Sequence, residues 1–436
     1  MNQLPFNPAL SAGIYAEAIA ELAALDLAPG TKGLLPQNCP IPFGEVGGKG
    51  WNLFRNDVSF PVAALRLSAI ERNSRTMQSY LGANGISLAP HGKTSMAPQL
   101  FARQIADGAW GITISSVAHL AVCLHFGFRR LIIANQVIGT AEIDYVAGVL
   151  ARTPDLELFI LVDSVAGAER LARCRSSGNL PQCLLEIGYA GGRTGCRSVE
   201  AALATVAAIR KAGLPLRGVA GFEGLLSDVA LVDEFLDRIC SIAVQCDALK
   251  AFADPGEILL SAGGSAYYDR LAQRLQTSAL AGRTRLVARS GCYLTHDSGT
   301  YETAFAAVRQ RDQALPADGF EPALLVFAQV LSRPEPEKAI ISLGRRDVGT
   351  DGGMPVPLLH FRPGRDDGPL PLGADMRLTG INDQHGHLSL QTHTDLAVGD
   401  IIGFGISHPC TTFDKWKVLL AVDDDWTVID AIKTFF

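Results

Sequence analysis

The sequence lacks the features that would place the protein in a membrane, in an oxidising compartment or on a nucleic acid. Its 436 residues contain no apolar run near the roughly 18 residues that a membrane-spanning helix needs. The nine cysteines include no C-x-x-C pair, so a disulfide scaffold is not expected and a reducing compartment is the default. Lys and Arg number 38 against 44 Asp and Glu, and this net charge of −6 argues against binding by phosphate neutralisation.

Targeting and nucleotide-binding motifs are also missing. The segment Met1–Pro5 has no basic residue, and no signal-type apolar stretch follows it. The glycines of Gly47–Gly50 do not fit G-x-x-x-x-G-K-[ST], and G-x-G-x-x-G does not occur. We therefore expect a cytoplasmic globular enzyme with neither a membrane nor a nucleic acid as partner.

The middle of the chain alternates short apolar runs with segments of helical composition. Eight runs have strand character: Leu88–His91, Gly111–Ser115, Arg130–Asn135, Leu156–Asp163, Cys183–Gly188, Gly218–Glu223, Ile258–Ala262 and Leu286–Ala288. Eight strands with intervening helices are typical of a (β/α)8 barrel. The same period also fits an open doubly wound sheet, because periodicity cannot show closure.

The rhythm changes after about Asp297. Helical patterns fade, and strand-like runs alternate with loops rich in Gly, Pro and Asp. This change predicts a barrel over residues 57–297 and an all-β domain over residues 298–436, to which the N-terminal region can add strands. The first 56 residues form an N-terminal extension with one amphipathic helix candidate, Ser11–Leu25.

A histidine and a lysine follow the first predicted barrel strand, in the segment Ala89–Thr94. The C-terminal ends of barrel strands form the active-site mouth, and residues two apart on a strand share one face. His91 and Lys93 are therefore expected to point into the mouth together. A desolvated lysine loses its proton readily and can form a Schiff base with an aldehyde. The competing interpretation is a solvated lysine in a loop.

Two further patterns favour ligand binding. Glycine clusters follow the seventh and eighth predicted strands, in Ser261–Ser265 and Arg289–Tyr293. Loops at these positions commonly bind phosphate through backbone N–H groups, although tight turns would also explain the glycines. Near the C-terminus, His408 and Cys410 stand two residues apart, and an imidazole with a thiolate suits zinc. A buried cysteine beside a hydrogen-bonded histidine would give the same sequence.

Taken in order, these motifs resemble one known family. They are H-x-K-T at 91–94, E-I-G at 186–188, G-R-T-G at 192–195, G-F-E-G at 221–224, the two glycine loops, and S-H-P-C at 407–410. The order is similar to that of the fold-type III pyridoxal-phosphate enzymes. Within them it most resembles the D-serine dehydratase and D-threonine aldolase branch, with its bacterial D-serine deaminase-like members. The resemblance extends from about Pro61 to Ile432.

The resemblance implies a fold and a set of site residues. The fold is an alanine-racemase-type barrel with a C-terminal β domain, usually in a homodimer with the active site near both subunits. The Schiff-base lysine would be Lys93, with His91 near the cofactor ring and Arg193 near its pyridine side. The metal pair would be His408 and Cys410, and the thiolate favours zinc as the divalent ion. The phosphate cradle of pyridoxal 5'-phosphate would fall on Gly263, Gly264, Ser265, Gly291, Cys292 and Tyr293.

The resemblance also implies a reaction, the dehydration and deamination of a D-amino acid with a β-hydroxyl group. D-Serine would give pyruvate and ammonia. Aldolase relatives usually carry aspartate in place of the metal-binding cysteine, so Cys410 favours dehydration. Three departures from the family bear on the substrate: Ser95-Met96 in place of His-Lys, Phe222 in place of tyrosine, and His119 in place of an acidic residue.

Several alternatives use the same fold. A D-threonine aldolase or a D-3-hydroxyaspartate dehydratase would use the same lysine and metal on a different β substituent. An amino-acid racemase would use two bases on opposite faces of the substrate and would not need His408 and Cys410. A non-catalytic cofactor carrier is the alternative outside enzymes, and the long C-terminal domain argues against it.

Overall fold

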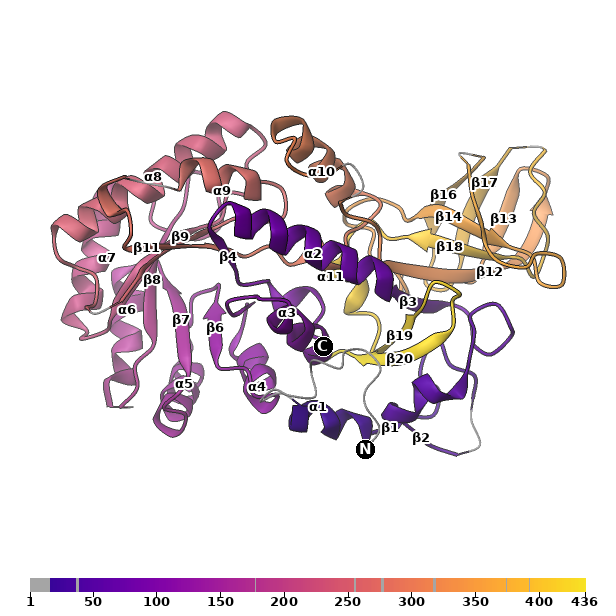
Figure 1. Cartoon of the computed structure of the whole chain (residues 1–436), viewed down its shortest axis with the longest axis horizontal. Coiled ribbons are helices and arrows are strands. Elements are labelled where there is room, and N and C mark those ends of the chain that lie inside the picture. Colours follow the sequence, from indigo (N-terminus) through magenta and orange to yellow (C-terminus); the bar gives the residue numbers. More distant parts are fainter. Residues whose placement is uncertain are drawn as a thin grey trace.

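The computed structural model describes residues 16–36, 39–176, 178–254, 256–275, 278–316, 319–373, 375–391 and 393–436. A parallel β-barrel ringed by helices lies beside an antiparallel β domain, and the N-terminal segment packs beneath the end of that domain (Figure 1). Part of the predicted helix Ser11–Leu25 is observed as α1 (Ala16–Ala23), and residues 11–15 lie outside the described ranges.

Eight parallel strands form the barrel, and each overlaps a strand predicted from the sequence. They are β4 (Ile86–Leu88), β5 (Ile112–Ile114), β6 (Arg130–Ile133), β7 (Glu157–Val162), β8 (Gln182–Ile187), β9 (Leu216–Gly221), β10 (Ile258–Ala262) and β11 (Thr284–Ala288). Their order is β4-β11-β10-β9-β8-β7-β6-β5. A parallel bridge between His91 and Thr113 joins the β4 and β5 ends, with the Thr113 N–H donating to Pro90 O at 2.9 Å. The sheet is closed, which confirms the barrel and excludes the open sheet.

The side-chain alternation of the strands explains the two layers of the barrel core. In β7, Phe159 and Leu161 belong to the cluster inside the barrel, while Leu158, Ile160 and Val162 belong to the layer under the helices. Nine helices flank these strands in the described ranges: α2 (Leu67–Ala83), α3 (Pro98–Ala106), α4 (Val117–His125), α5 (Thr140–Arg152), α6 (Val165–Leu171), α7 (Val199–Lys211), α8 (Val229–Ala248), α9 (Tyr268–Arg274) and α10 (Thr300–Arg311).

Local sequence signals begin four of these helices. The side chains of Ser116, Ser164, Ser198 and Asp228 each accept a hydrogen bond from one backbone N–H in the first turn of α4, α6, α7 and α8. Each capping residue lies in the loop that follows a barrel strand. The cap therefore fixes where the helix begins and how long the loop at the strand end is. Among the described residues, no helix is long and apolar enough to cross a membrane.

The second body is a ten-stranded, largely antiparallel sheet. Its strands are β3 (Val62–Arg66), β12 (Leu324–Glu335), β13 (Lys338–Ile341), β14 (Val356–Phe361), β15 (Leu370–Pro371), β16 (Met376–Ile381), β17 (Gly386–Leu390), β18 (Ile401–Gly405), β19 (Val418–Val422) and β20 (Val428–Lys433). The short helix α11 (Pro409–Phe413) follows β18 and returns the chain to the barrel. At the N-terminal end, the two-stranded sheet of β1 (Asp26–Leu27) and β2 (Ile41–Pro42) leads into a 3-10 helix that packs on β20.

One strand of the β domain comes from outside the range 298–436. β3 lies inside the range 57–297 expected for the barrel, but it pairs with β12 and β19 before α2 enters the barrel. Its residues are apolar on both faces: Ala63 and Leu65 pack in the barrel-side core, whereas Val62 and Ala64 pack in the core of the β domain. A strand buried on both faces has no polar alternation, so its sequence does not indicate its sheet.

Candidate active site

Two short 3-10 turns meet at the C-terminal mouth of the barrel. Residues Gly92–Thr94 (η3) follow β4, and Cys292–Leu294 (η6) follow β11, the strand paired with β4. Gly291 lets these turns touch, because a Cβ there would lie 2.6 Å from Thr94 Oγ1 and 2.7 Å from the His91 carbonyl oxygen. The H-x-K-T segment and the S-G-C-Y loop are therefore direct neighbours.

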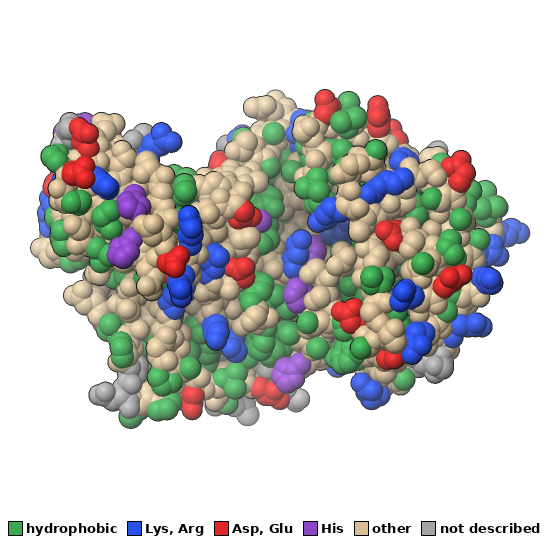
Figure 2. Space-filling view, turned by 180° about the vertical axis from the view of Figure 1, so that it is seen from behind, with side chains coloured by type: hydrophobic (Ala, Val, Ile, Leu, Met, Phe, Trp, Pro, Cys, Tyr) green, Lys and Arg blue, Asp and Glu red, His purple; other side chains and the backbone are tan. Residues whose placement is uncertain are grey.

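A cavity of about 330 Å³ opens at this mouth. Its lining includes five of the predicted site residues, His91, Lys93, Arg193, Gly263 and Gly264. The strand β4 ends at Leu88, so His91 and Lys93 come from the following turn and not from one strand face as expected. Both nevertheless line the same cavity. On the face shown in Figure 2, the surface is hollowed between the two bodies, and Lys, Arg and His side chains gather there.

His91 is held as a neutral imidazole. Burial lowers its pKa well below the usual range, and the nearby charges of Lys93 and Arg289 lower it further. Its Nδ1 atom is buried and has no hydrogen-bond partner among the described residues. A buried polar atom without a partner is costly, and a hydrogen bond from a ligand would remove that cost.

Two arginines add positive charge to the cavity. Arg289 was not among the expected site residues; it is buried and donates to Ser261 Oγ at 3.0 Å and to the Gly221 carbonyl oxygen at 2.5 Å. It is the first residue after β11, so the rule that identified the mouth residues of the first strand would have found it. The Arg193 guanidinium stacks over the Phe222 ring, 4.5 Å from its centroid.

Two carboxylates face these cations, and one of them occupies the glycine loop after β10. The fully buried Glu223 accepts the N–H of Gly263 at 3.0 Å and that of Gly264 at 2.8 Å. The loop was expected to bind the cofactor phosphate, but here its two N–H groups are taken by the Glu223 carboxylate, so their contact with a phosphate stays a prediction. The buried Glu186 accepts from Thr194 Oγ1 at 3.0 Å and also from the Gln136 amide.

Three other predicted cradle residues lie around this loop. Ser265 and Tyr293 line a separate small cavity beside Tyr268, and the Tyr293 hydroxyl accepts from Gln104 Nε2 at 3.1 Å. Gly291 lies at the contact between the two turns. The structure therefore separates Ser265 and Tyr293 from the Lys93 cavity, and their contact with a phosphate stays a prediction.

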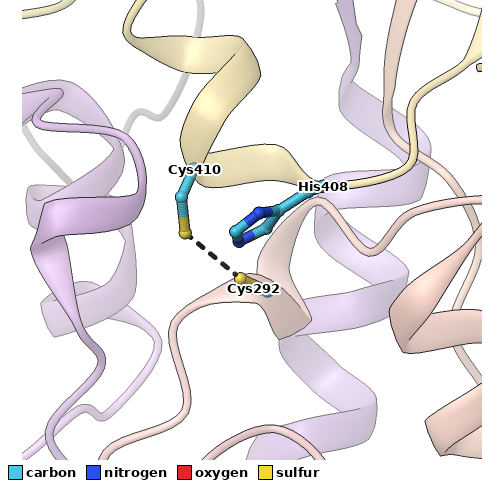
Figure 3. A group of neighbouring side chains, drawn as sticks. All are labelled: Cys292, His408 and Cys410. Atoms are coloured by element: carbon cyan, nitrogen blue, oxygen red, sulfur yellow. Dashed lines mark hydrogen bonds between the residues drawn. The ribbon is translucent and has the colours of Figure 1, made fainter. Parts of the chain in front are cut away.

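Cys292, the last predicted cradle residue, turns its side chain to the proposed metal pair (Figure 3). One ligand atom from each of Cys292, His408 and Cys410 lies within 4.8 Å of the other two, and the two sulfurs are 3.6 Å apart. His408 has extended backbone and Cys410 lies in α11, so the pair converges through a helix start and not along one strand. Sequence reasoning placed Cys292 only in the phosphate loop.

The surroundings of this cluster favour the thiolate of Cys410, the thiol of Cys292 and the protonated imidazole of His408, so an ion that binds all three would displace protons from Cys292 and His408. His408 Nδ1 lies 2.6 Å from Asp351 Oδ2, which leaves Nε2 facing the sulfurs. Hydrogen bonding to Cys410 raises the pKa of His408 to about 9, and Asp351 adds to this effect. Hydrogen bonds from Cys292 and His408 lower the pKa of Cys410, which favours the thiolate. Thr94 Oγ1 is 3.4 Å from Cys410 Sγ, so the cluster adjoins the Lys93 turn.

Comparisons with known proteins support the same family. Residues 323–422 match a family described as "Putative serine dehydratase domain". The chain is 26% identical over 369 residues to a D-threonine aldolase of Arthrobacter sp., covering 84% of this chain and 90% of that protein. It is 26% identical over 386 residues to the D-threo-3-hydroxyaspartate dehydratase of Delftia sp. strain HT23, covering 84% of this chain and 95% of that protein.

Solved structures show the same fold. D-Threonine aldolase from Filomicrobium marinum aligns with a TM-score of 0.71 at 23% identity, over 87% of this chain and 95% of that one. A similar structure, of a D-threo-3-hydroxyaspartate dehydratase, is a cysteine-to-alanine mutant in the metal-free form. These structures confirm the fold, an alanine-racemase-type barrel with its β domain. The matched family and the sequence relatives support the resemblance to the D-serine dehydratase and D-threonine aldolase branch. The curated relatives are lyases named for D-amino acids that carry a β-hydroxyl group.

Proposed function

We propose that this protein is a pyridoxal-phosphate-dependent, metal-assisted lyase that dehydrates and deaminates a D-amino acid with a β-hydroxyl group. With D-serine, each turnover releases one pyruvate and one ammonia. One observation carries the proposal: the cavity that contains Lys93 adjoins, through Thr94, a cluster of one imidazole and two thiols. The similarity to a D-amino acid aldolase and a dehydratase supports this class of reaction.

The cavity fits pyridoxal phosphate in size and charge. Its volume of about 330 Å³ lies in the range typical of cofactor sites. Arg289 brings positive charge for a phosphate ester, although the Glu186 carboxyl also lines the cavity, and His91 Nδ1 lacks a partner among the described residues. Lys93 would hold the aldehyde carbon, and these neighbours would hold the rest. The chemistry that the cofactor supplies when bound is an electron sink for the pair left on the substrate α carbon.

The residues of the chain provide the proton chemistry and the orientation. Lys93 supplies an amine at the cavity, and its Nζ takes the α proton of the substrate. Because His91 is neutral, it can hydrogen-bond a ligand without adding a third positive charge beside Lys93 and Arg289. Arg193 stands at the exposed side of the cavity, where a substrate carboxylate would enter.

The metal cluster provides the means to remove a hydroxyl group. His408 and Cys410 would hold a divalent ion, and Asp351 orients the imidazole as a hydrogen-bond partner of a metal-binding histidine does. The chemistry that such an ion supplies when bound is polarisation of the poor β-hydroxyl leaving group. The soft sulfur ligand favours zinc. Cys410 stands where the aldolase relatives usually carry aspartate, which favours dehydration over the aldol cleavage named for the first relative.

Product analysis tests the proposal. Protein supplied with pyridoxal phosphate and zinc is incubated with D-serine, L-serine, D-threonine and D-threo-3-hydroxyaspartate. We expect keto acid and ammonia from D-serine and none from L-serine. Glycine and an aldehyde from D-threonine would support the aldolase alternative, and keto acid from the hydroxyaspartate alone would support the second relative's reaction. Interconversion of D- and L-amino acids without loss of the β-hydroxyl would show a racemase and refute the proposal.

Variants connect the activity to the two parts of the site. Lys93→Ala is expected to lose the cofactor mass that borohydride reduction fixes to the protein, whereas the surface variant Lys338→Ala keeps it. His408→Ala is expected to lose bound metal and keto-acid release together while still taking up the cofactor. Full activity after exhaustive chelation would remove the metal from the mechanism.

Two expectations complete the proposal. We propose that the protein is a cytoplasmic homodimer whose ligands are the small D-amino acid, pyridoxal phosphate and the divalent metal. Sedimentation of the cofactor-loaded protein tests the dimer directly. A monomer with full activity would show that the second subunit contributes nothing to the site.

A further inference from the structure

We propose that Cys292 is a third protein ligand of the metal, so that the centre is a Cys2His site with one open position. The motif predicts two metal ligands, His408 and Cys410, and the loop after β11 supplies the third. This inference rests on the metal-assisted function proposed above, and it names the donor set of that same site.

The separation of the sulfurs carries the inference. Zinc binds thiolates at about 2.3 Å, so two thiolates on one tetrahedral zinc ion stand about 3.8 Å apart. The observed distance between Cys292 Sγ and Cys410 Sγ is 3.6 Å. All three candidate ligand atoms lie within 4.8 Å of one another, and the His408 ring faces the two sulfurs (Figure 3). The two sulfurs therefore stand close to the separation that one shared zinc ion requires, with the imidazole nearby.

The position of Cys292 is defined by its surroundings. It begins η6 and is buried, only 3% exposed, whereas Cys410 on α11 is partly exposed. Thr94 Oγ1 lies 3.9 Å from Cys292 Sγ and 3.4 Å from Cys410 Sγ, on the turn that carries Lys93. His408 and Cys410 are partly exposed and Cys292 is buried, so a substrate hydroxyl would reach a bound ion from the side of His408 and Cys410.

A third ligand changes which ion the site selects. A single thiolate with imidazole and water admits several divalent ions, whereas two thiolates with an imidazole form a soft set that favours zinc over magnesium and manganese. Three protein ligands plus one open position also match the arrangement of catalytic zinc sites. The ligands come from both bodies of the protein, because Cys292 follows a barrel strand and His408 and Cys410 follow β18. A bound ion would thus tie the β domain to the mouth of the barrel.

Cobalt substitution tests the ligand count without measuring activity. The metal-stripped, pyridoxal-phosphate-loaded protein is titrated with Co²⁺, and the sulfur-to-cobalt charge-transfer absorbance is compared among wild type, Cys292→Ser and Cys410→Ser. We expect each variant to lose about half of this absorbance, because each removes one of two thiolates. We also expect Cys292→Ser to bind Co²⁺ at least about tenfold more weakly. Losing a residue that only hydrogen-bonds a ligand already costs about tenfold or more in metal affinity, so losing a direct ligand should cost no less. X-ray absorption of the zinc form should show two sulfurs per ion.

A matched control separates ligand loss from disturbed folding. Cys240 is also buried, and its Sγ lies 3.3 Å from the Arg274 carbonyl oxygen, far along the chain from this cluster. Cys240→Ser should keep the full charge-transfer absorbance. If Cys292→Ser does not fold, Cys292→Ala takes its place, and far-ultraviolet circular dichroism checks both proteins.

Two results would overturn the inference. Undiminished charge-transfer absorbance in a folded Cys292→Ser protein would leave this thiol as a hydrogen-bonding neighbour only. A single sulfur per zinc in the wild type would do the same. These outcomes are independent of the proposed function. Two thiolates on the metal without lyase activity would refute the function and support Cys292 as a ligand. Lyase activity with an unchanged Cys292→Ser spectrum would support the function and refute Cys292 as a ligand.

Discussion

Replacing Gly291 with alanine should separate the two turns that carry Lys93 and Cys292. The new Cβ would lie 2.6 Å from Thr94 Oγ1, 2.7 Å from the His91 carbonyl oxygen and 3.0 Å from His91 Cβ. Side-chain rotation can relieve the first contact, but the second is with the backbone of the neighbouring turn. Real Cβ atoms do not approach oxygen so closely, so one turn must shift.

The size of the effect follows from this overlap. Inserting a methyl group into a well-packed site costs about 1–3 kcal/mol, and the two oxygen contacts place Gly291→Ala in the upper part of that range. Cys292 is the next residue, so any shift of its turn also moves the sulfur that lies 3.6 Å from Cys410. We expect a lower unfolding midpoint in urea together with weaker Co²⁺ binding.

A second glycine provides the control. Gly82 lies in α2 and has no atom within 4 Å of an added Cβ. Gly82→Ala should be neutral or more stable by up to about 1 kcal/mol, because alanine favours the helix. The reasoning is refuted if Gly291→Ala unfolds at the wild-type urea concentration and keeps the wild-type Co²⁺ spectrum.

Three further predictions concern carboxylates. Asp351→Asn should weaken zinc binding about 10–100-fold while His408 still binds, because the carboxylate orients that imidazole; competition with a zinc chelator measures it, and unchanged affinity would contradict the role. Glu223→Gln should cost about 1.5–3 kcal/mol in urea unfolding, because an amide has only one acceptor oxygen for the two glycine N–H groups; a wild-type midpoint would show that these bonds contribute little. Burial raises the pKa of Asp430 to about 6 in the folded protein, from 3.8. The folded protein therefore binds the Asp430 proton more tightly than the unfolded chain does. The stability that the protonated Asp430 contributes is complete below about pH 4 and is lost as the pH rises through 6. Asp430→Asn should match the wild type in unfolding at pH 4 and exceed it by about 1–3 kcal/mol at pH 8, and an equal gain at both values would refute the assignment.

Much of the fold could be predicted because its signals are local. Each barrel strand is a short apolar run, and its side chains alternate between the interior and the helix layer whatever their neighbours are, as Phe159 and Ile160 show in β7. The strand ends then place His91 and Lys93 at the mouth, since every parallel strand of a barrel ends on the same side. Barrel closure, by contrast, depends on the bridge between His91 and Thr113, which no single segment encodes.

The parts that could not be predicted depend on contacts between distant segments. β3 is apolar on both faces, so only its pairing with β12 and β19 assigns it to the β domain. The glycines after β10 have the pattern of a phosphate loop, but whether Glu223 occupies their N–H groups depends on how two neighbouring loops pack.

The metal cluster shows the same division. His408 and Cys410 belong to one short segment, so their spacing suggested a metal pair, and the family resemblance made that pair a prediction. Cys292 stands 118 positions away from Cys410, in a loop that by composition belongs to phosphate binding. Only the folded chain brings its sulfur to 3.6 Å from the second thiol, because the distance between residues so far apart is set by how the barrel and the β domain pack, and not by local sequence.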